Sequence, residues 1–325
     1  FVPSGLPEFG VHFAAEELPL PGSPPEGSVK ARVKAISVDP YLRGRMKDVK
    51  SYFPGFSIGK PGDSGILIEV IESNSAKYPV GALLSGFGQW VTYQILSEDQ
   101  LKAFWPVIPG ISETAALGIL GMPGATAYFG YFDLCLPKEG ETLVVSGAAG
   151  AVGSIVVQLG KIRGCRVIGI AGTDDKLAYL QSIGADVALN YHTPDLQAAI
   201  AQAAPGGGDQ DFDNTGGEIK DAVFANLNSF ARVSSCGAIS SYNLLDAPLG
   251  KTWEWAIITK QIRNEGFICN RWAPKWPEAF AEMAGWIKEG KLKFEETKEH
   301  GIENVITAFN TMMSGGNTGK MVVIV

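Results

Sequence analysis

The sequence predicts an α/β protein in which a doubly wound parallel sheet is combined with a mostly β domain. Up to about residue 110, glycine and proline punctuate short apolar runs, which is typical of antiparallel strands. Residues 141–176 read as strand, glycine turn, helix and strand. Strands then alternate with helices, which is the pattern of a parallel sheet covered by helices. The length of 325 residues indicates two domains.

The elements of the β half are predicted from local patterns. Prolines and glycines are frequent in residues 1–30 and mark an irregular or edge segment. Strands are predicted at residues 29–38, 65–72, 82–87 and 89–95. After the first of these, residues 39–46 combine a turn signal with a short polar piece that resembles a helix. A last strand at residues 321–325 is expected to return to this domain.

The second half is predicted from apolar periodicity. One helix face is indicated by Val152, Ile155, Val156, Leu159 and Ile162. Helices are predicted at residues 113–120, 126–133, 152–162, 176–183, 196–203, 218–227, 277–289 and 302–313. Strands are predicted at residues 142–145, 167–170, 187–190, 211–213 and 237–241.

A glycine turn connects the first strand and helix of this half. It reads Ala148-x-Gly150-x-x-Gly153, one alanine away from the dinucleotide fingerprint G-x-G-x-x-G. Gly150 would let the backbone approach a pyrophosphate at the positive end of the helix, and Gly153 would let the helix pack closely on its strand. A methyl group at Ala148 is expected to be tolerated. The flanking strands and helix favour a nucleotide site over a plain glycine-rich turn.

Composition excludes several classes of partner. A net charge of −7 without a basic cluster argues against nucleic acid, because phosphate neutralisation requires lysine and arginine on one face. No run reaches the roughly 18 uninterrupted apolar residues of a membrane span, and the N-terminus has no signal-peptide pattern. A cytoplasmic protein with a small-molecule ligand is expected. The chain begins at Phe1 without methionine, and whether residues precede it is left open by the sequence.

The cysteines and histidines are too scattered to predict a metal site. None of the cysteines forms a C-x-x-C pair, and the histidines are far apart along the chain. These residues are Cys135, Cys165, Cys236, Cys269, His12, His192 and His300. We therefore expect separate buried or half-buried thiols, with no disulfide framework and no bound zinc.

Six motifs together resemble the medium-chain dehydrogenase/reductase superfamily. They are residues 38–46 (VDPYLRGRM), 121–128 (GMPGATAY), 147–154 (GAAGAVGS), 212–217 (FDNTGG), 239–243 (ISSYN) and 316–320 (GNTGK). The chain is most similar to the zinc-free branch of leukotriene B4 dehydrogenase/prostaglandin reductases, plant alkenal double-bond reductases and bacterial curcumin reductase. Where zinc-dependent members carry Gly-His-Glu, this chain has Gly59-Lys60-Pro61.

The resemblance implies a fold, a cofactor and a reaction. A Rossmann domain at residues 118–289 is expected to be inserted in a GroES-like β domain formed by residues 1–117 and 290–325. The implied activity is NADPH-dependent reduction of a carbon–carbon double bond conjugated to a ketone or aldehyde, by hydride transfer to the β-carbon. A homodimer is also implied, with weak support from the tryptophans of residues 253–286.

NADPH rather than NADH is expected from the end of the second strand. The acid that selects NAD comes about 20 residues after the glycine turn, where it accepts from the ribose 2′-hydroxyl. Here that strand ends in Ala171-Gly172-Thr173, without a carboxylate. Asp174 and Asp175 follow, and they either cap the next helix or reach the ribose.

The resemblance also assigns individual site residues. Tyr242 is assigned as the donor to the substrate carbonyl oxygen, although its position alone fits packing equally well. Tyr41 is assigned to the substrate pocket. Lys176 and Tyr191 match the residues that contact the 2′-phosphate. The full set of cofactor-binding residues is Met122, Thr126, Ala149, Gly150, Ala151, Val152, Gly153, Gly172, Lys176, Tyr191, Asn214, Tyr242, Phe267, Cys269 and Asn317.

Two alternative functions remain open at this point. A quinone reductase shares the fold and NADPH, and a non-catalytic NADP-binding protein shares the cofactor site. The basic run of Arg43, Arg45 and Lys47 is interpreted as a solvated surface rather than a contact to an anionic substrate.

Overall fold

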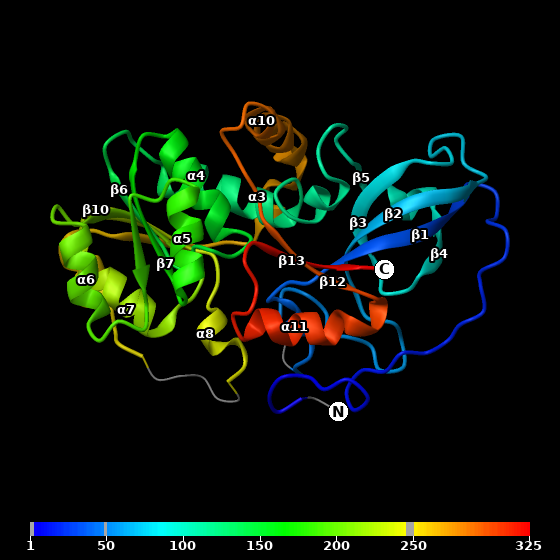
Figure 1. The fold of residues 1–325 in the computed structure, drawn as a ribbon, viewed down its shortest axis with the longest axis horizontal. Helices are drawn as coiled ribbons and strands as arrows, with labels where there is room; N and C mark the ends of the chain where they lie inside the picture. The colour runs from blue at the N-terminus through cyan, green and yellow to red at the C-terminus, as the bar shows by residue number, and fades with distance from the viewer. Residues whose placement is uncertain (1–2, 49–50, 245–249) are drawn as a thin grey trace. The chain divides into compact units, whose positions relative to one another are not determined.

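The computed structural model describes residues 3–48, 51–244 and 250–325. Its contacts divide the chain into two compact units. Unit 1 comprises Phe1–Gly121 with Glu296–Val325, and unit 2 comprises Met122–Glu295 (Figure 1). The boundaries expected from the sequence, after residues 117 and 289, each lie a few residues earlier in the chain.

Unit 2 is built on a six-stranded parallel sheet. The strands are β6 (Thr142–Val145), β7 (Arg166–Ala171), β8 (Val187–Asn190), β9 (Gly208–Asp213), β10 (Leu227–Ser235) and β11 (Arg263–Gly266). Their order is β11-β10-β9-β6-β7-β8, and every ladder is parallel. This is the doubly wound order of the Rossmann fold, which confirms the predicted fold class. The order reverses between β6 and β9, so a ligand crevice is expected at their carboxyl ends.

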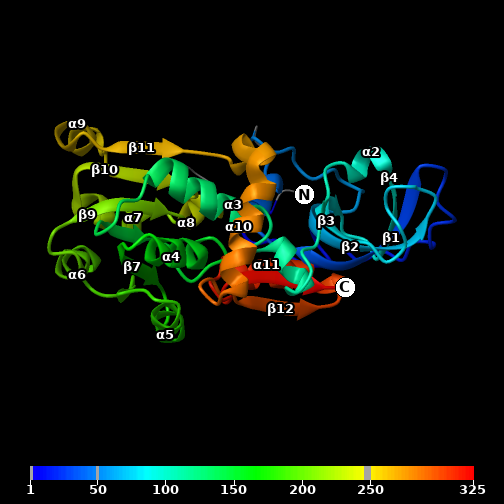
Figure 2. The same ribbon diagram turned by 90° about the horizontal axis from the view of Figure 1, so that it is seen from above.

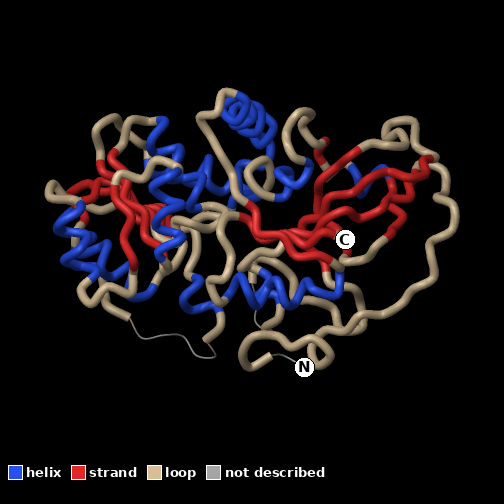
Figure 3. Tube along the Cα trace, in the orientation of Figure 1, coloured by secondary structure: helices blue, strands red, loops and turns tan. Residues whose placement is uncertain are grey.

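Helices cover both faces of this sheet (Figure 3). The helices are α3 (Met122–Phe129), α4 (Gly153–Ile162), α5 (Asp174–Ser182), α6 (Leu196–Ala203), α7 (Gly217–Ala225), α8 (Ile239–Tyr242), α9 (Glu254–Lys260) and α10 (Trp276–Lys288), with short helical pieces η2 (Gly130–Cys135) and η3 (Cys269–Lys275). On one face, Val144 and Ile168 pack in one apolar cluster with residues of α6 and α7. On the other, α4 lies so close that a Cβ at Gly160 would be 2.7 Å from a Leu143 methyl carbon.

One predicted element near the end of the sheet is wrong, and another is predicted two residues too long. No strand runs over residues 237–241: β10 ends at Ser235, and α8 follows it. The helix predicted at residues 218–227 ends at Ala225, and Leu227 already begins β10. The sequence does not predict β10, because several polar residues interrupt the apolar alternation that is typical of a strand. Its pairing with β9 is also irregular between Leu227 and Arg232. β11, a polar strand beside β10, was missed for the same reason (Figure 2).

Unit 1 contains a seven-stranded sheet centred on β1 (Ser28–Ser37). The other strands are β2 (Asp63–Ser73), β3 (Leu83–Gln89), β4 (Tyr93–Ser97), β5 (Trp105–Pro106), β12 (Glu296–His300) and β13 (Lys320–Ile324). One edge of β1 pairs with β2, and the other edge is shared by β4 and β13. The antiparallel β1–β13 pairing confirms that the C-terminal strand returns to the β domain.

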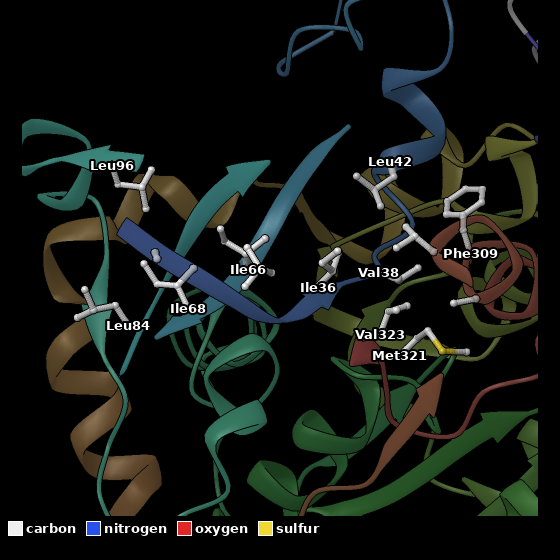
Figure 4. Close-up of a cluster of buried hydrophobic side chains, with 14 of the residues drawn as sticks. Ile36, Val38, Leu42, Ile66, Ile68, Leu84, Leu96, Phe309, Met321 and Val323 are labelled. Carbon is white, nitrogen blue, oxygen red and sulfur yellow. The ribbon is translucent and has the colours of Figure 1, made fainter. Parts of the chain in front are cut away.

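The core of unit 1 joins the sheet to the C-terminal helix. The helices are α1 (Leu42–Arg45), α2 (Glu98–Leu101), η1 (Glu113–Leu117), η4 (Ile302–Asn304) and α11 (Val305–Met313). Phe309 of α11 is fully buried in one cluster with Val38, Leu42 and Val323 (Figure 4). The cluster therefore binds the two ends of the chain into one core.

The interpretation of residues 43–47 as a solvated basic surface is wrong for both arginines. Arg43 is fully buried and Arg45 is 5% exposed. Arg45 donates to the carboxylate of Asp63 at 2.7 Å, and its guanidinium lies over the rings of Phe53 and Phe56. The sequence pattern missed this because paired arginines can be buried against aromatic rings.

In the described residues, no helix is both long and apolar enough to cross a membrane.

Candidate active site

The glycine turn between β6 and α4 has the close packing that the sequence predicted. A Cβ at Gly153 would lie 2.4 Å from the Gly147 carbonyl oxygen, so only glycine fits there. Gly147 has a φ of +56°, whereas Ala148 does not have a positive φ. Ala148 is fully buried, and its N–H donates to the Ile170 carbonyl at 3.0 Å. A methyl group is tolerated at Ala148 because the left-handed residue of this turn is Gly147.

The residues of this turn fit a bound pyrophosphate. The N–H groups of Ala149, Val152 and Gly153 donate to no acceptor within the described part of the chain. Ala149 is 3% exposed, and buried backbone donors are nearly always paired in proteins. Such donors at the positive end of a helix bind phosphate oxygens. The turn therefore fits the phosphate-binding role that the sequence predicts for it.

Three predicted cofactor residues follow the carboxyl ends of β7 and β8. The Tyr191 ring packs over Gly172, where a Cβ would lie 2.7 Å from the tyrosine oxygen. The Tyr191 N–H donates to Ala171 at 3.0 Å. Lys176 is half-buried in the first turn of α5, and burial lowers its pKa. Asp174 and Asp175 are exposed in the same turn.

Ser146 and Asn214 join β6 to β9 at the point where the strand order reverses. The Asn214 N–H donates to the Ser146 hydroxyl oxygen at 2.9 Å. The Asn214 side-chain amide donates to the Ser146 carbonyl at 2.7 Å. The two strand ends that flank the expected crevice are therefore held together by side-chain contacts. Sequence reasoning found Asn214 but missed Ser146, because a serine before a glycine turn has no distinctive pattern.

Tyr242 lies at the same end of the sheet, although it does not follow the strand predicted for it. It is the last residue of the short helix α8, after the carboxyl end of β10. Its hydroxyl oxygen accepts the N–H of Ala238 at 3.1 Å. A phenolic hydroxyl can accept and donate at the same time, so accepting this bond leaves its own proton for donation to a ligand. Burial raises the pKa of Tyr242, so the hydroxyl stays protonated at neutral pH.

The remaining predicted residues of unit 2 lie on α3 and after β11. Met122 and Thr126 are one turn apart on α3, and the Thr126 hydroxyl donates to the Met122 carbonyl at 2.8 Å. Phe267 packs against the rings of Phe212 and Trp272, and Cys269 is 7% exposed. These contacts describe packing, and the cofactor roles assigned to these residues stay predictions.

In unit 1, Tyr41 and Asn317 lie in loops joined by a buried ion pair. Asp39 and Lys320 are 4% and 3% exposed, and Lys320 Nζ lies 3.2 Å from the Asp39 carboxylate. Lys320 also donates to the Val38 carbonyl at 2.6 Å. The pair thus connects the loop that begins at Asp39 to the start of β13. Both residues lie within motifs that carry the family resemblance, but the sequence did not indicate a role for either of them.

Tyr41 itself packs against aromatic neighbours. Its ring centroid lies 5.8 Å from that of Phe53, and Phe53 lies 5.1 Å from Phe87. Burial, followed by the charge of Asp39, raises the pKa of Tyr41 well above its usual value. The Asn317 amide donates to the Gly319 carbonyl at 2.8 Å, which shapes its own loop.

Among the residues that the structure describes, no cluster of three or more histidine, cysteine or acidic side chains is placed to hold a metal ion.

Comparison with known proteins identifies the family. Residues 2–104 match the N-terminal domain of oxidoreductase, and residues 151–289 match a family described as zinc-binding dehydrogenase. The putative NADP-dependent oxidoreductase YfmJ of Bacillus subtilis is 44% identical, over 99% of this chain and 94% of its own length. The NADPH-dependent curcumin reductase of Escherichia coli is 40% identical, over 93% and 88%.

A solved structure extends the likeness to the whole fold. The crystal structure of CurA from Vibrio vulnificus in complex with NADPH is 37% identical and has a TM-score of 0.92. The match covers 99% of this chain and 96% of that one. The chain therefore belongs to the medium-chain dehydrogenase/reductase superfamily, in the branch of the prostaglandin, curcumin and 2-alkenal reductases.

Proposed function

We propose that this protein is an NADPH-dependent ene-reductase that reduces the double bond of α,β-unsaturated ketones or aldehydes. The observation that carries the proposal is the Tyr242 hydroxyl. It is protonated, it is oriented by the Ala238 N–H, and it lies at the ligand-binding end of a parallel sheet. The names of the related curcumin, prostaglandin and 2-alkenal reductases support the same substrate class.

The chain's own residues account for cofactor binding in this proposal. Bound NADPH supplies a hydride for the β-carbon of the substrate. The turn from Ala149 to Gly153 binds the pyrophosphate, with the unpaired N–H groups of Ala149, Val152 and Gly153 as donors. Lys176 with Tyr191 binds the 2′-phosphate. Asn214 and Asn317 line the ribose and nicotinamide, and Tyr41 contributes to the substrate pocket.

In this proposal, Tyr242 acts as a neutral hydrogen-bond donor to the carbonyl oxygen of the substrate. Conjugation moves the negative charge that follows hydride addition onto the carbonyl oxygen. A donor placed at that oxygen stabilises the charge more in the transition state than in the bound substrate. The proposal therefore assigns polarisation of the carbonyl to Tyr242 rather than to a metal ion.

A comparison of acceptors tests the proposal directly. NADPH oxidation by the purified protein is followed with an α,β-unsaturated ketone, with a quinone and without acceptor. We expect oxidation with the enone, and mass spectrometry should identify the saturated ketone as the product. Oxidation with the quinone alone would favour a quinone reductase. Formation of the allylic alcohol would contradict hydride transfer to the β-carbon.

The first prediction concerns selection of NADPH by Lys176. Replacing Lys176 with alanine removes a charge-assisted bond to phosphate, which is worth about 1.5–3 kcal/mol. We therefore expect Lys176→Ala to weaken NADPH binding on the order of tenfold or more and to spare NADH. Fluorescence titration with both cofactors measures this. Lys288→Ala, on the exposed end of α10, is the control. Equal weakening of both cofactors would reject the assigned role.

The second prediction is that activity requires no metal. Where zinc-dependent members of the superfamily carry Gly-His-Glu, this chain has Gly59-Lys60-Pro61. Without a metal ion, the substrate carbonyl is polarised by hydrogen bonds alone. We expect enone reduction to persist after dialysis against a chelator, with no stoichiometric zinc in elemental analysis. Loss of activity with the chelator and recovery with zinc would overturn this prediction.

The third prediction is a homodimer that uses the surface of α9. Trp255 and Ile258 are 78% and 68% exposed on this helix, and α9 lies next to β10 near the sheet edge formed by β11. Exposed large apolar side chains of this kind favour burial in an interface. Light scattering should give twice the mass of one chain, and Trp255→Glu should shift the protein towards monomer. A monomeric parent at micromolar concentration would contradict the prediction.

A further inference from the structure

One carboxylate organises the end of the sheet between the glycine turn and the loop that carries Tyr242. Asp213 is 1% exposed at the end of β9. Its Oδ1 accepts the Ser146 hydroxyl at 3.0 Å and the N–H groups of Thr215 and Gly216 at 3.0 and 2.9 Å. Its Oδ2 lies 3.7 Å from Lys220 Nζ. The carboxylate therefore fixes the backbone turn that follows β9 and ties it to β6.

The same turn holds the segment that leads to the tyrosine. The Asp213 carbonyl accepts the N–H groups of Cys236 and Gly237 at 2.9 and 3.1 Å. The next carbonyl, that of Asn214, accepts the first N–H of α8 at 3.3 Å. The Thr215 carbonyl accepts the N–H of Ser240, the second residue of α8, at 3.1 Å. A movement of the turn would therefore move α8.

We propose that Asp213 is a positioning residue which, together with Ser146, holds the Tyr242 hydroxyl in place for catalysis. The inference rests on the role of Tyr242 in the proposed function. Asp213 does not donate to the substrate in this account. It acts through backbone carbonyls, whose positions depend on the N–H groups bound by its carboxylate.

The geometry explains why position 213 requires an acceptor. Alanine at this site would leave the donors of Ser146, Thr215 and Gly216 buried without an acceptor. Each such unsatisfied donor lowers the stability of the folded protein. Asparagine keeps an acceptor oxygen in the place of Oδ1. We therefore expect Asp213→Asn to retain about tenfold more activity than Asp213→Ala, because small displacements at a catalytic site have large effects on rate.

A milder variant tests the proposal without removing the carboxylate. Ser146→Ala deletes one bond to Asp213 and one from Asn214. Ser234 is the matched control, because it is a fully buried serine on β10 whose hydroxyl has no partner in the described part of the chain. We expect Ser146→Ala to lower kcat for an enone about tenfold and Ser234→Ala to lower it less than about twofold.

A double-mutant cycle separates positioning of Tyr242 from a general loss of structure. If Ser146 acts through Tyr242, Ser146→Ala should lower kcat less than about threefold once Tyr242 is already phenylalanine. NADPH affinity and the thermal midpoint are measured for every variant. A positioning role predicts that the decrease in kcat exceeds any change in these two quantities.

The outcomes distinguish this inference from the proposed function. Non-additive losses at Ser146 and Tyr242, with partial activity in Asp213→Asn, support the positioning role. Additive losses, or equal kcat in Ser146→Ala and Ser234→Ala, overturn it and leave the proposed function intact. A parent protein that does not reduce enones overturns the proposed function, and with it any role in placing Tyr242.

Discussion

Replacing Tyr242 with phenylalanine is expected to lower kcat for an enone by about 10²–10³, which corresponds to about 2.7–4 kcal/mol of transition-state stabilisation. The variant keeps the ring and loses only the hydroxyl that is oriented by Ala238. A cofactor ribose hydroxyl that shares the charge would place the loss at the lower end of this range. Because the contact strengthens in the transition state, NADPH affinity should change little. Steady-state kinetics together with NADPH titration measure both quantities.

A second tyrosine provides the control for this experiment. Tyr128 is also half-buried in unit 2, and its hydroxyl bonds to Glu282. Tyr128→Phe should therefore leave kcat close to that of the parent. If Tyr242→Phe reduces enones at the parent rate, the assigned role is wrong.

The pH profile gives a further test of Tyr242. Burial raises the pKa of this phenol above its ordinary value of 10.0. A tyrosine that must donate a proton is active below its pKa and inactive above it. The decrease in kcat attributable to Tyr242 should consequently be centred above pH 10.0 and be absent from Tyr242→Phe. A decrease centred between pH 7 and 8 would point to a different donor.

The second large effect is expected at the buried ion pair of unit 1. Asp39→Ala leaves the Lys320 ammonium, which is 3% exposed, without its carboxylate. Removing one partner of a buried pair typically costs about 3–5 kcal/mol of stability. We expect a clear decrease in the thermal midpoint, measured by calorimetry. Activity should also fall, since this pair connects the loops of Tyr41 and Asn317.

Two further variants check the cause of this decrease. Asp39→Ala combined with Lys320→Met removes both charges and should recover part of the lost stability. Asp99 forms an exposed ion pair with Lys102, and Asp99→Ala should leave the thermal midpoint unchanged. Equal midpoints for Asp39→Ala and Asp99→Ala would show that the buried pair is not important for stability.

Much of the fold follows from short-range patterns. The glycine turn, the strands around it and α4 were predictable because one βαβ unit carries its apolar periodicity and its glycines within a continuous stretch. Glycine was expected at position 153 because the helix must pack closely on the preceding strand. The structure confirms this close packing, since a Cβ at Gly153 would meet the Gly147 carbonyl oxygen. The last strand was predictable for the same reason, because it is a short, almost purely apolar run.

Local patterns failed where polar residues fill structural positions. β10 and β11 carry arginine, asparagine and serine, so their place in the sheet depends on neighbours that are distant in sequence. Arg45 was misread because its burial depends on Asp63 and on surrounding aromatic rings. The contact roles assigned to Met122, Phe267 and Cys269 came from resemblance and stay predictions.

The sequence by itself determined that this chain has a parallel sheet with a dinucleotide-type turn and a β domain completed by its last strand. Only the tertiary structure decided that Ser146 meets Asp213, that Lys320 meets Asp39, and that Tyr242 ends a short helix. The physical reason is the range of the interactions. Periodicity and turn chemistry act between neighbours in sequence, whereas a buried charge or hydroxyl finds its partner only after distant strands have paired.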